Sequence, residues 1–425
     1  MKFNKTTLPN GIRVITIPMA DNPSVTVLVM VAAGSKYETK EQSGLSHFLE
    51  HMVFKGTARR PKASDISREL DGLGAQYNAF TAQEFTGYYV KAATIHFDKI
   101  LDVISDMYQN PLFDPSELAK EKGVIIEEIR MYNDLPQQHV RDLFFESLYG
   151  DQPAGWNIAG TIENVKTFDR QALISYRDSH YVSNAMSIIV AGSIDTHSVE
   201  KSIEKAFSKA LNAKKSEKVK VIEKQDEPKI TIEFKDTDQT HIVIGVRTFP
   251  IDDQRMPVMR VLSAILGYGM SSRLFSKLRD ELGICYYVKA DNESFTDHGV
   301  FTVSAGVDNS RIKEAIENIL AICGGLGWEK VSDAELQKVK DHIAGTMLLE
   351  LETSESRAEY CGYQDIVKNN IELPEEIVNK INGVNADHVM DLARQIFVNR
   401  NLNLAVIGKI ADSDILRSYF KFESR

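Results

Sequence analysis

Residues 44–57 read GLSHFLEHMVFKGT and contain the pattern HxxEH. On an α-helix, positions i, i+3 and i+4 lie on one side, so His47, Glu50 and His51 project together. The apolar side chains of a helix over about residues 44–54 fall on the other side: Leu45, Phe48, Leu49, Met52 and Val53. The stretch therefore predicts an amphipathic helix that buries one face and presents two imidazoles and a carboxylate on the other.

These groups have the chemistry of a zinc site. Zinc accepts neutral imidazole nitrogen and carboxylate oxygen, and a nearby carboxylate that does not bind the ion can take a proton from water. A chance HxxEH is expected in about two of a hundred chains of this length and composition, so the pattern by itself also fits a solvated helix face. It supplies two ligands and a base, and the third ligand has to come from elsewhere in the chain.

A second helix is predicted to begin at Asp114-Pro115-Ser116-Glu117 and to run to about Tyr132, because a capping residue precedes a proline and an acidic residue. Glu121 and Glu128 are seven residues apart and share a stripe, whereas Glu127 points away. A carboxylate among aliphatic side chains is costly unless it is paired or coordinated. Glu128 is therefore the better third ligand and Glu121 the better group behind the ligands, with a surface ion pair of Glu128 as the alternative. Their expected apolar neighbours are Leu118, Val124 and Ile125.

Strand and helix signals alternate along the chain and recur after a charged stretch. Strands are predicted over residues 11–18, 24–31, 184–192 and 230–246, paired strands over 75–90, and helices over 95–108, 257–266 and 311–320. Residues 213–229 (AKKSEKVKVIEKQDEPK) predict a linker between a metal-binding domain over 1–212 and a similar domain over 230–425. We therefore expect an α+β fold with two structurally similar α/β-sandwich halves, each an antiparallel-rich sheet packed with helices, from an internal duplication.

Composition and charge exclude several classes of protein. A length of 425 residues suggests two or three domains, and a net charge of -10 disfavours nucleic acid or an anionic membrane as partner. The start of the chain lacks the apolar region of a signal peptide, and no stretch approaches the roughly 18 apolar residues of a membrane span. The three cysteines show no CxxC spacing, which predicts neither disulfides nor a thiolate metal site. A cytoplasmic location is the prediction.

Several motifs resemble the pitrilysin/insulinase family of zinc peptidases, the inverted zincins, which includes the mitochondrial processing peptidases. The motifs are residues 44–57, GAQYNAFTAQEFTGYYV at 74–90, EKGVIIEEI at 121–129 and SSRLFSKLRDELGICYYV at 271–288. The length is similar to that of short-chain bacterial members. The resemblance implies that His47, His51 and Glu128 bind one zinc ion per chain, that Glu50 is the general base and that Glu121 supports the site.

The resemblance also implies further roles, each with a plainer alternative. Asn78, Ala79, Phe80 and Thr81 match an edge strand that takes an extended substrate, although Asn78 also suits a turn and Phe80 a core. Arg279 and Tyr286 match an arginine and a tyrosine that bind substrate near the metal, with Tyr287 as a register alternative. An exposed helical arginine and a buried strand aromatic are the plainer interpretations. The second half has no HxxEH; residues 258–266 read VMRVLSAIL.

The predicted function is that of a zinc metalloendopeptidase acting on peptides or unfolded segments, with Glu50 activating the attacking water. The resemblance implies that two chains close around a chamber, as a homodimer or a heterodimer. The alternative is a non-catalytic assembly subunit, or a processing subunit that needs a different partner chain. Manganese and cobalt accept the same ligand types as zinc.

Overall fold

The chain folds as two compact units in a computed structural model that describes residues 1–410 and 413–423. Unit 1 comprises Met1–Arg130, Trp156–Val219 and Leu348–Glu372. Unit 2 comprises Met131–Gly155, Lys220–Met347 and the chain from Leu373 onward. Each unit thus draws segments from both sequence halves, and the domain boundaries that the charged stretch suggests stay a prediction.

The sheet of unit 1 has six strands in the order β1-β2-β6-β3-β5-β4. Its only parallel pair is β2 with β6. The strands are β1 (Asn4–Thr7), β2 (Arg13–Pro18), β3 (Ser24–Val31), β4 (Gln76–Thr81), β5 (Thr86–Ala93) and β6 (Met186–Gly192). All of these strands except β1 were predicted from the sequence. Strand β1 reads NKTT and is largely exposed, so it lacks the hydrophobic alternation that would predict a strand.

The sheet of unit 2 repeats this arrangement with five strands in the order β7-β11-β8-β10-β9. Its one parallel pair, β7 with β11, occupies the place of β2 with β6. The strands are β7 (Lys229–Phe234), β8 (Gln239–Thr248), β9 (Cys285–Ser294), β10 (Gly299–Asp308) and β11 (Asn403–Gly408). Apart from the additional β1, the two strand orders match, which confirms the predicted α+β fold with two similar halves.

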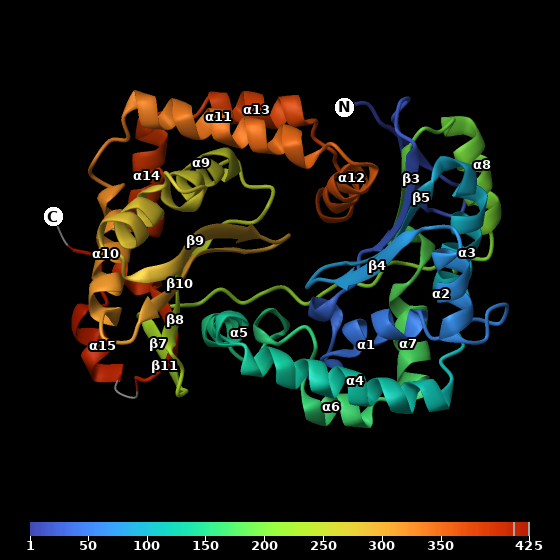
Figure 1. The fold of residues 1–425 in the computed structure, drawn as a ribbon, viewed down its shortest axis with the longest axis horizontal. Helices are drawn as coiled ribbons and strands as arrows, with labels where there is room; N and C mark the ends of the chain where they lie inside the picture. The colour runs from blue at the N-terminus through green and yellow to red at the C-terminus, as the bar shows by residue number, and fades with distance from the viewer. Residues whose placement is uncertain (411–412, 424–425) are drawn as a thin grey trace. The chain divides into compact units, whose positions relative to one another are not determined.

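Helices cover both faces of the sheet in unit 1. Figure 1 shows α3 and α8 on one face, where they pack against β5, β3 and β2, and α12 on the other, against β3, β6 and β2. The helices are α1 (Leu45–Val53), α2 (Ala63–Asp71), α3 (Phe97–Gln109), α4 (Pro115–Asp134, which continues into unit 2), α6 (Ile162–Thr167), α7 (Arg170–His180), α8 (Thr196–Ala206) and α12 (Ser354–Lys368). Helix α12 thus closes the sheet of unit 1 although it comes from the second sequence half.

Unit 2, in turn, contains a helix from the first sequence half, α5, which packs on its sheet. Helix α5 packs against β11, β8 and β7, while α10 packs on β10 and α14 on β8. The helices are α5 (Pro136–Tyr149), α9 (Met256–Gly267), α10 (Ile312–Gly325), α11 (Asp333–Glu350, whose last residues belong to unit 1), α13 (Pro374–Asn382), α14 (Ala386–Ile396) and α15 (Ser413–Tyr419). The segment η6 (Phe275–Glu281) is π-helical.

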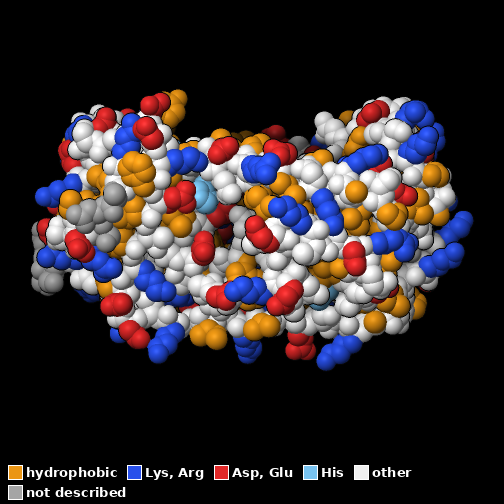
Figure 2. Space-filling model, turned by 90° about the horizontal axis from the view of Figure 1, so that it is seen from below, with side chains coloured by type: hydrophobic (Ala, Val, Ile, Leu, Met, Phe, Trp, Pro, Cys, Tyr) orange, Lys and Arg blue, Asp and Glu red, His pale blue; other side chains and the backbone are white. Residues whose placement is uncertain are grey.

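Two properties concern the partners that the chain can have: the distribution of charge on its surface, and the length and hydropathy of its helices. On the face shown in Figure 2, Lys and Arg side chains are interspersed with Asp and Glu, so the described residues form no broad basic area there. Among the described helices, none combines the length and the hydropathy that crossing a membrane requires.

Candidate active site

Helix α1 carries the HxxEH pattern and buries the face that the sequence predicted, with Leu45, Phe48, Leu49, Met52 and Val53 in the core. The helix begins after Gly44, whose φ of 100° is left-handed. A Cβ at Gly44 would lie 2.6 Å from the carbonyl oxygen of Ala159, so glycine is required there. The backbone of the neighbouring segment therefore sets where the helix starts.

The buried carboxylate of Glu38 caps the first turn of α1. It accepts hydrogen bonds from the backbone N–H of Gly44 at 2.9 Å and of Ser46 at 2.6 Å. Burial raises the pKa of Glu38 to about 8, against the opposing effect of the hydrogen bonds from Ser46 and Gly44. Sequence reasoning missed this residue, because Glu38 lies ahead of Gly44 and outside the usual N-cap position.

The structure brings His47, His51 and Glu128 together within unit 1. Glu128 Oε2 lies 3.7 Å from His47 Nε2 and 3.6 Å from His51 Nε2. One ligand atom from each of the three lies within 4.8 Å of the others, and no other His, Cys, Asp and Glu side chains among the described residues form such a group. The alternative that Glu128 is a surface ion pair with a lysine or arginine has no support in these contacts.

The spacing of this group and the neutral state of His47 fit a zinc ion. Zinc–ligand bonds of about 2.0–2.2 Å in a tetrahedral site place ligand atoms roughly 3.3 Å apart, near the 3.7 and 3.6 Å between Glu128 and the two histidines. Burial, with the charge of His51 beside it, lowers the pKa of His47 to about 4, so its imidazole is neutral at pH 7. The imidazole nitrogens of His47 and His51 and a carboxylate oxygen of Glu128 are a donor set that zinc accepts.

Glu121 lies behind the candidate ligands, as the sequence predicted. Its Oε1 is 2.8 Å from His51 Nδ1 and its Oε2 is 2.7 Å from Lys55 Nζ. Burial alone would raise the pKa of Glu121, but the hydrogen bonds from His51 and Lys55 hold it below its ordinary range. When Nδ1 of His51 carries the proton and donates to Glu121, Nε2 on the side of Glu128 is the nitrogen left to bind a metal ion.

Helix α4 holds both glutamates and begins as predicted, with Asp114 Oδ1 accepting from the N–H groups of Ser116 and Glu117. Glu121 is buried and Glu127 is exposed, as the periodicity indicated. Val124, predicted to be an apolar neighbour of the two glutamates, is 50% exposed, whereas Leu118 and Ile125 are buried. It stands one turn before Glu128 on the flank of the helix that is not covered by the core.

Glu50 accepts a hydrogen bond from the hydroxyl of Thr81, with Thr81 Oγ1 2.5 Å from Glu50 Oε2. Burial raises the pKa of Glu50, and the negative charge of Glu128 adds to this, while Thr81 and His51 oppose it. A raised pKa brings a carboxylate closer to the working pH of a general base. Sequence reasoning assigned Thr81 to the substrate strand and did not anticipate its bond to Glu50.

The four residues of the predicted substrate strand lie on β4, at the edge of the sheet and paired with β5 alone. Asn78 is exposed and Ala79 half-buried. The ring of Phe80 covers Gly87 and meets Phe85 edge to face, so part of it packs within the sheet. An edge strand with a free side can add an extended peptide by main-chain pairing.

Arg279 and Tyr286 belong to unit 2, on η6 and at the start of β9. The Arg279 guanidinium stands 4.9 Å from the centre of the Tyr286 ring and 5.5 Å from that of Phe275. Tyr286 is 70% exposed, whereas the Tyr287 hydroxyl lies 3.1 Å from His241 Nδ1. The structure thus pairs Arg279 with Tyr286 inside unit 2.

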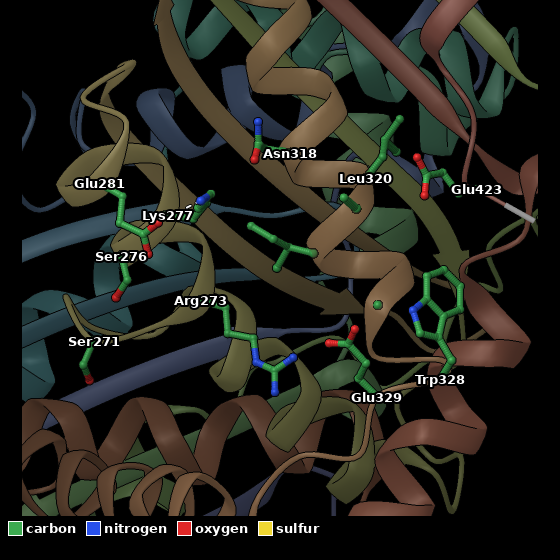
Figure 3. A pocket seen from close by; sticks show the side chains of 13 residues that line it. Ser271, Arg273, Ser276, Lys277, Glu281, Asn318, Leu320, Trp328, Glu329 and Glu423 are labelled. Atoms are coloured by element: carbon green, nitrogen blue, oxygen red, sulfur yellow. Dashed lines mark hydrogen bonds and ion pairs between the residues drawn. The ribbon is translucent and has the colours of Figure 1, made fainter. Parts of the chain in front are cut away.

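A separate hollow of about 550 Å³ lies in unit 2 between the segment from Ser271 to Glu281, helix α10 and Trp328 (Figure 3). Of its charged side chains, Arg273 makes a two-pronged ion pair with Glu335, and Lys277 pairs with Glu281. None of the predicted site residues lines it.

Two family models match the chain. Residues 13–162 match the Insulinase (Peptidase family M16) model, and residues 167–343 match the Peptidase M16 inactive domain model. A relative named "Uncharacterized zinc protease YmxG" from Bacillus subtilis is 35% identical over 394 residues, covering 92% of this chain and 95% of the relative. An "Uncharacterized zinc protease" from Rickettsia felis is 33% identical over 407 residues, covering 96% and 97%.

Solved structures share the fold. A structure titled as a protease from Helicobacter pylori superposes with a TM-score of 0.90 at 22% identity, over 96% of this chain and 99% of the other. The chain belongs to the insulinase family, peptidase family M16.

Proposed function

We propose that this chain is a zinc-dependent endopeptidase that hydrolyses peptides or unfolded polypeptide segments. The observation that carries the proposal is the convergence of His47, His51 and Glu128, with Glu50 on the same helix face. The names of the relatives as zinc proteases support it. Membership of the family is shown, whereas the reaction and the residues that perform it are what we propose.

In the proposed mechanism, His47, His51 and Glu128 hold zinc, and Glu121 fixes the orientation of the His51 ring through its Nδ1–H. Bound zinc supplies Lewis acidity, which polarises the scissile carbonyl and makes water easier to deprotonate. Glu50 takes the proton of the attacking water and passes it to the leaving amine. The free edge of β4 holds the substrate extended, so that one peptide bond lies beside Glu50.

The test is cleavage of quenched fluorescent peptides by the purified chain, with its zinc content measured in parallel. About one zinc ion per chain, with activity that a chelator removes and zinc restores, is the expected result. A chain that binds zinc and cleaves no peptide in a broad library would favour the alternative of a non-catalytic or partner-dependent subunit.

We further propose that two chains form a closed chamber and that Arg279 and Tyr286 bind the substrate backbone. The test mixes Glu50→Gln chains with Arg279→Ala chains. Each variant is expected to be inactive alone. Recovered activity is expected if one chain supplies zinc and base to a site completed by the other. A mixture without recovery, in an assembly that sizing shows to exchange chains, would contradict sharing between chains.

A further inference from the structure

The candidate base, Glu50, accepts a side-chain hydrogen bond from the hydroxyl of Thr81. Thr81 Oγ1 donates to Glu50 Oε2 at 2.5 Å, and among the described residues no other side chain donates a hydrogen bond to Glu50. Hydrogen bonds to a carboxylate are short and about twice as strong as neutral ones. With Oε2 engaged by Thr81, Oε1 is the oxygen that remains to accept a proton.

Thr81 is the last residue of β4, and the turn that follows it is tightly held. The N–H of Ala82 donates to the carbonyl of Phe85 at 2.8 Å, and the N–H of Lys36 donates to the carbonyl of Gln83 at 2.8 Å. Gly34 approaches so closely that a Cβ there would lie 2.1 Å from the carbonyl oxygen of Ala82. The end of the strand therefore has little freedom to move away from α1.

A buried ion pair adds to this anchoring. Lys36 Nζ lies 3.0 Å from Glu84 Oε1, and both side chains are almost fully buried. Lys218, from the charged stretch that the sequence analysis identified as a linker, reaches the same oxygen at 3.4 Å. A paired and desolvated carboxylate fixes geometry more strictly than an exposed one, because either partner alone would be costly to bury. The turn thus holds Thr81 in one place relative to Glu50.

We infer that Thr81 is a positioning residue for the reaction: its hydroxyl holds the Glu50 carboxylate in the orientation needed to take a proton from water. This inference rests on the proposed function. It also separates two roles for Thr81, since substrate pairing along β4 uses main-chain groups and the bond to Glu50 uses the side chain. A small displacement of a catalytic group lowers the rate of a reaction steeply, so loss of this bond has a kinetic consequence.

The experiment compares Thr81→Val, which has the same shape without the hydroxyl, with Thr81→Ser, which retains it. We expect Thr81→Val to lower kcat about 10- to 100-fold with KM within about twofold of the parent. Thr81→Ser should recover most of kcat. Zinc content and the absorption spectrum of the cobalt-substituted protein should match the parent in both variants, because neither changes a ligand.

Two results would overturn the inference: an unchanged kcat in Thr81→Val, whether or not its KM is raised, or a Thr81→Ser variant as impaired as Thr81→Val. A parent chain without peptidase activity would count against the proposed function instead. In that case crystal structures of the zinc-loaded parent and Thr81→Val still decide the matter. A Glu50 carboxylate that keeps its orientation without the hydroxyl would refute the positioning role, and a rotated one would support it.

Discussion

The helices α1 and α4 of the first half and α9 and α11 of the second occupy corresponding places in two similar folds, yet the candidate metal ligands lie on the first pair. Helix α9 reads MPVMRVLSAILG, without histidine or carboxylate. When the starts of α4 and α11 are aligned, Asp114 corresponds to Ser332. In this alignment Val339 corresponds to Glu121, and Thr346 corresponds to Glu128. Where the first half buries an acid that supports an imidazole, the second half buries a valine.

The comparison teaches that this fold does not need a metal site to form. Val339 packs in the core of unit 2 with Leu336 and Ile343, and the strand order there matches that of unit 1. We therefore expect the candidate metal ligands to contribute little to the stability of the fold, which comes from apolar burial. Variants at the site should accordingly lose metal or activity while keeping the fold, and the following experiments test that separation.

The largest effect is expected for His51→Ala, which removes a ligand and the partner of Glu121. Zinc content should fall to background and peptide cleavage with it, while the far-ultraviolet circular dichroism stays that of the parent. His342→Ala, at an exposed position on α11, is the matched control and should behave like the parent. Retention of stoichiometric zinc by His51→Ala would contradict the ligand assignment.

Glu50→Gln should lower kcat about 10²- to 10⁴-fold while zinc remains bound, because the amide cannot act as a base. Steady-state kinetics together with metal analysis provide the measurement. Loss of zinc in this variant would mean that Glu50 is a ligand and not the base. The same exchange at Glu41, an exposed residue outside the site, serves as control.

The third effect is on stability and compares α12 with α5. Each of these two helices packs on a sheet formed mainly by the other half of the sequence. On α12 the buried Asp365 carboxylate pairs with Arg13 at 2.6 Å and with Lys5 at 2.6 Å, and also accepts from Ser187. The corresponding helix α5 carries Ser147, which hydrogen-bonds Thr231. Asp365→Asn should lower the free energy of unfolding by about 1.5–3 kcal/mol at pH 7, whereas Ser147→Ala should lower it less.

The contribution of Asp365 should depend on pH. Burial acts to raise the pKa of this carboxyl, but Arg13, Lys5 and Ser187 together hold it below its ordinary value of 3.8. A depressed folded pKa contributes stability above the unfolded pKa, and that contribution is lost as the pH falls through the folded pKa. Denaturant unfolding at pH 7 and below pH 4 should show the gap between parent and Asp365→Asn closing in acid. A gap independent of pH would exclude the ion pairs as its cause.

The smallest effect is expected for Glu121→Gln, which weakens the support of His51 without removing a ligand. Zinc affinity should fall about 10- to 100-fold, measured by competition with a chelator. Glu127→Gln on the exposed face of the same helix should leave the affinity unchanged. Equal losses in both variants would indicate a general effect of charge near the metal instead of the specific bond to His51.

The parts that sequence periodicity predicted are those decided within one helix or strand. The buried stripe of α1 and the Asp114 cap of α4 follow from spacing and local hydrogen bonding, and the structure has both. The exposure of Val124 could not be read from α4, because periodicity gives the angle around a helix and not the extent of its neighbours. The bonds of Glu38 to α1 and of Thr81 to Glu50 join separate segments, and no local pattern encodes them.

Helices α5 and α12 each pack on a sheet formed mainly by the other half of the sequence. This arrangement limits where the chain can be cut into fragments that fold independently. The face of the unit 1 sheet that carries Ile15, Leu28, Met30 and Ile189 is closed by Ala358 and Cys361 of α12. A fragment ending in the charged stretch would lack that helix and leave those aliphatic side chains in water, a patch prone to aggregation. Cleavage between residues 213 and 228 should accordingly produce two pieces that stay associated until denatured, and separately expressed fragments should become soluble only when produced together.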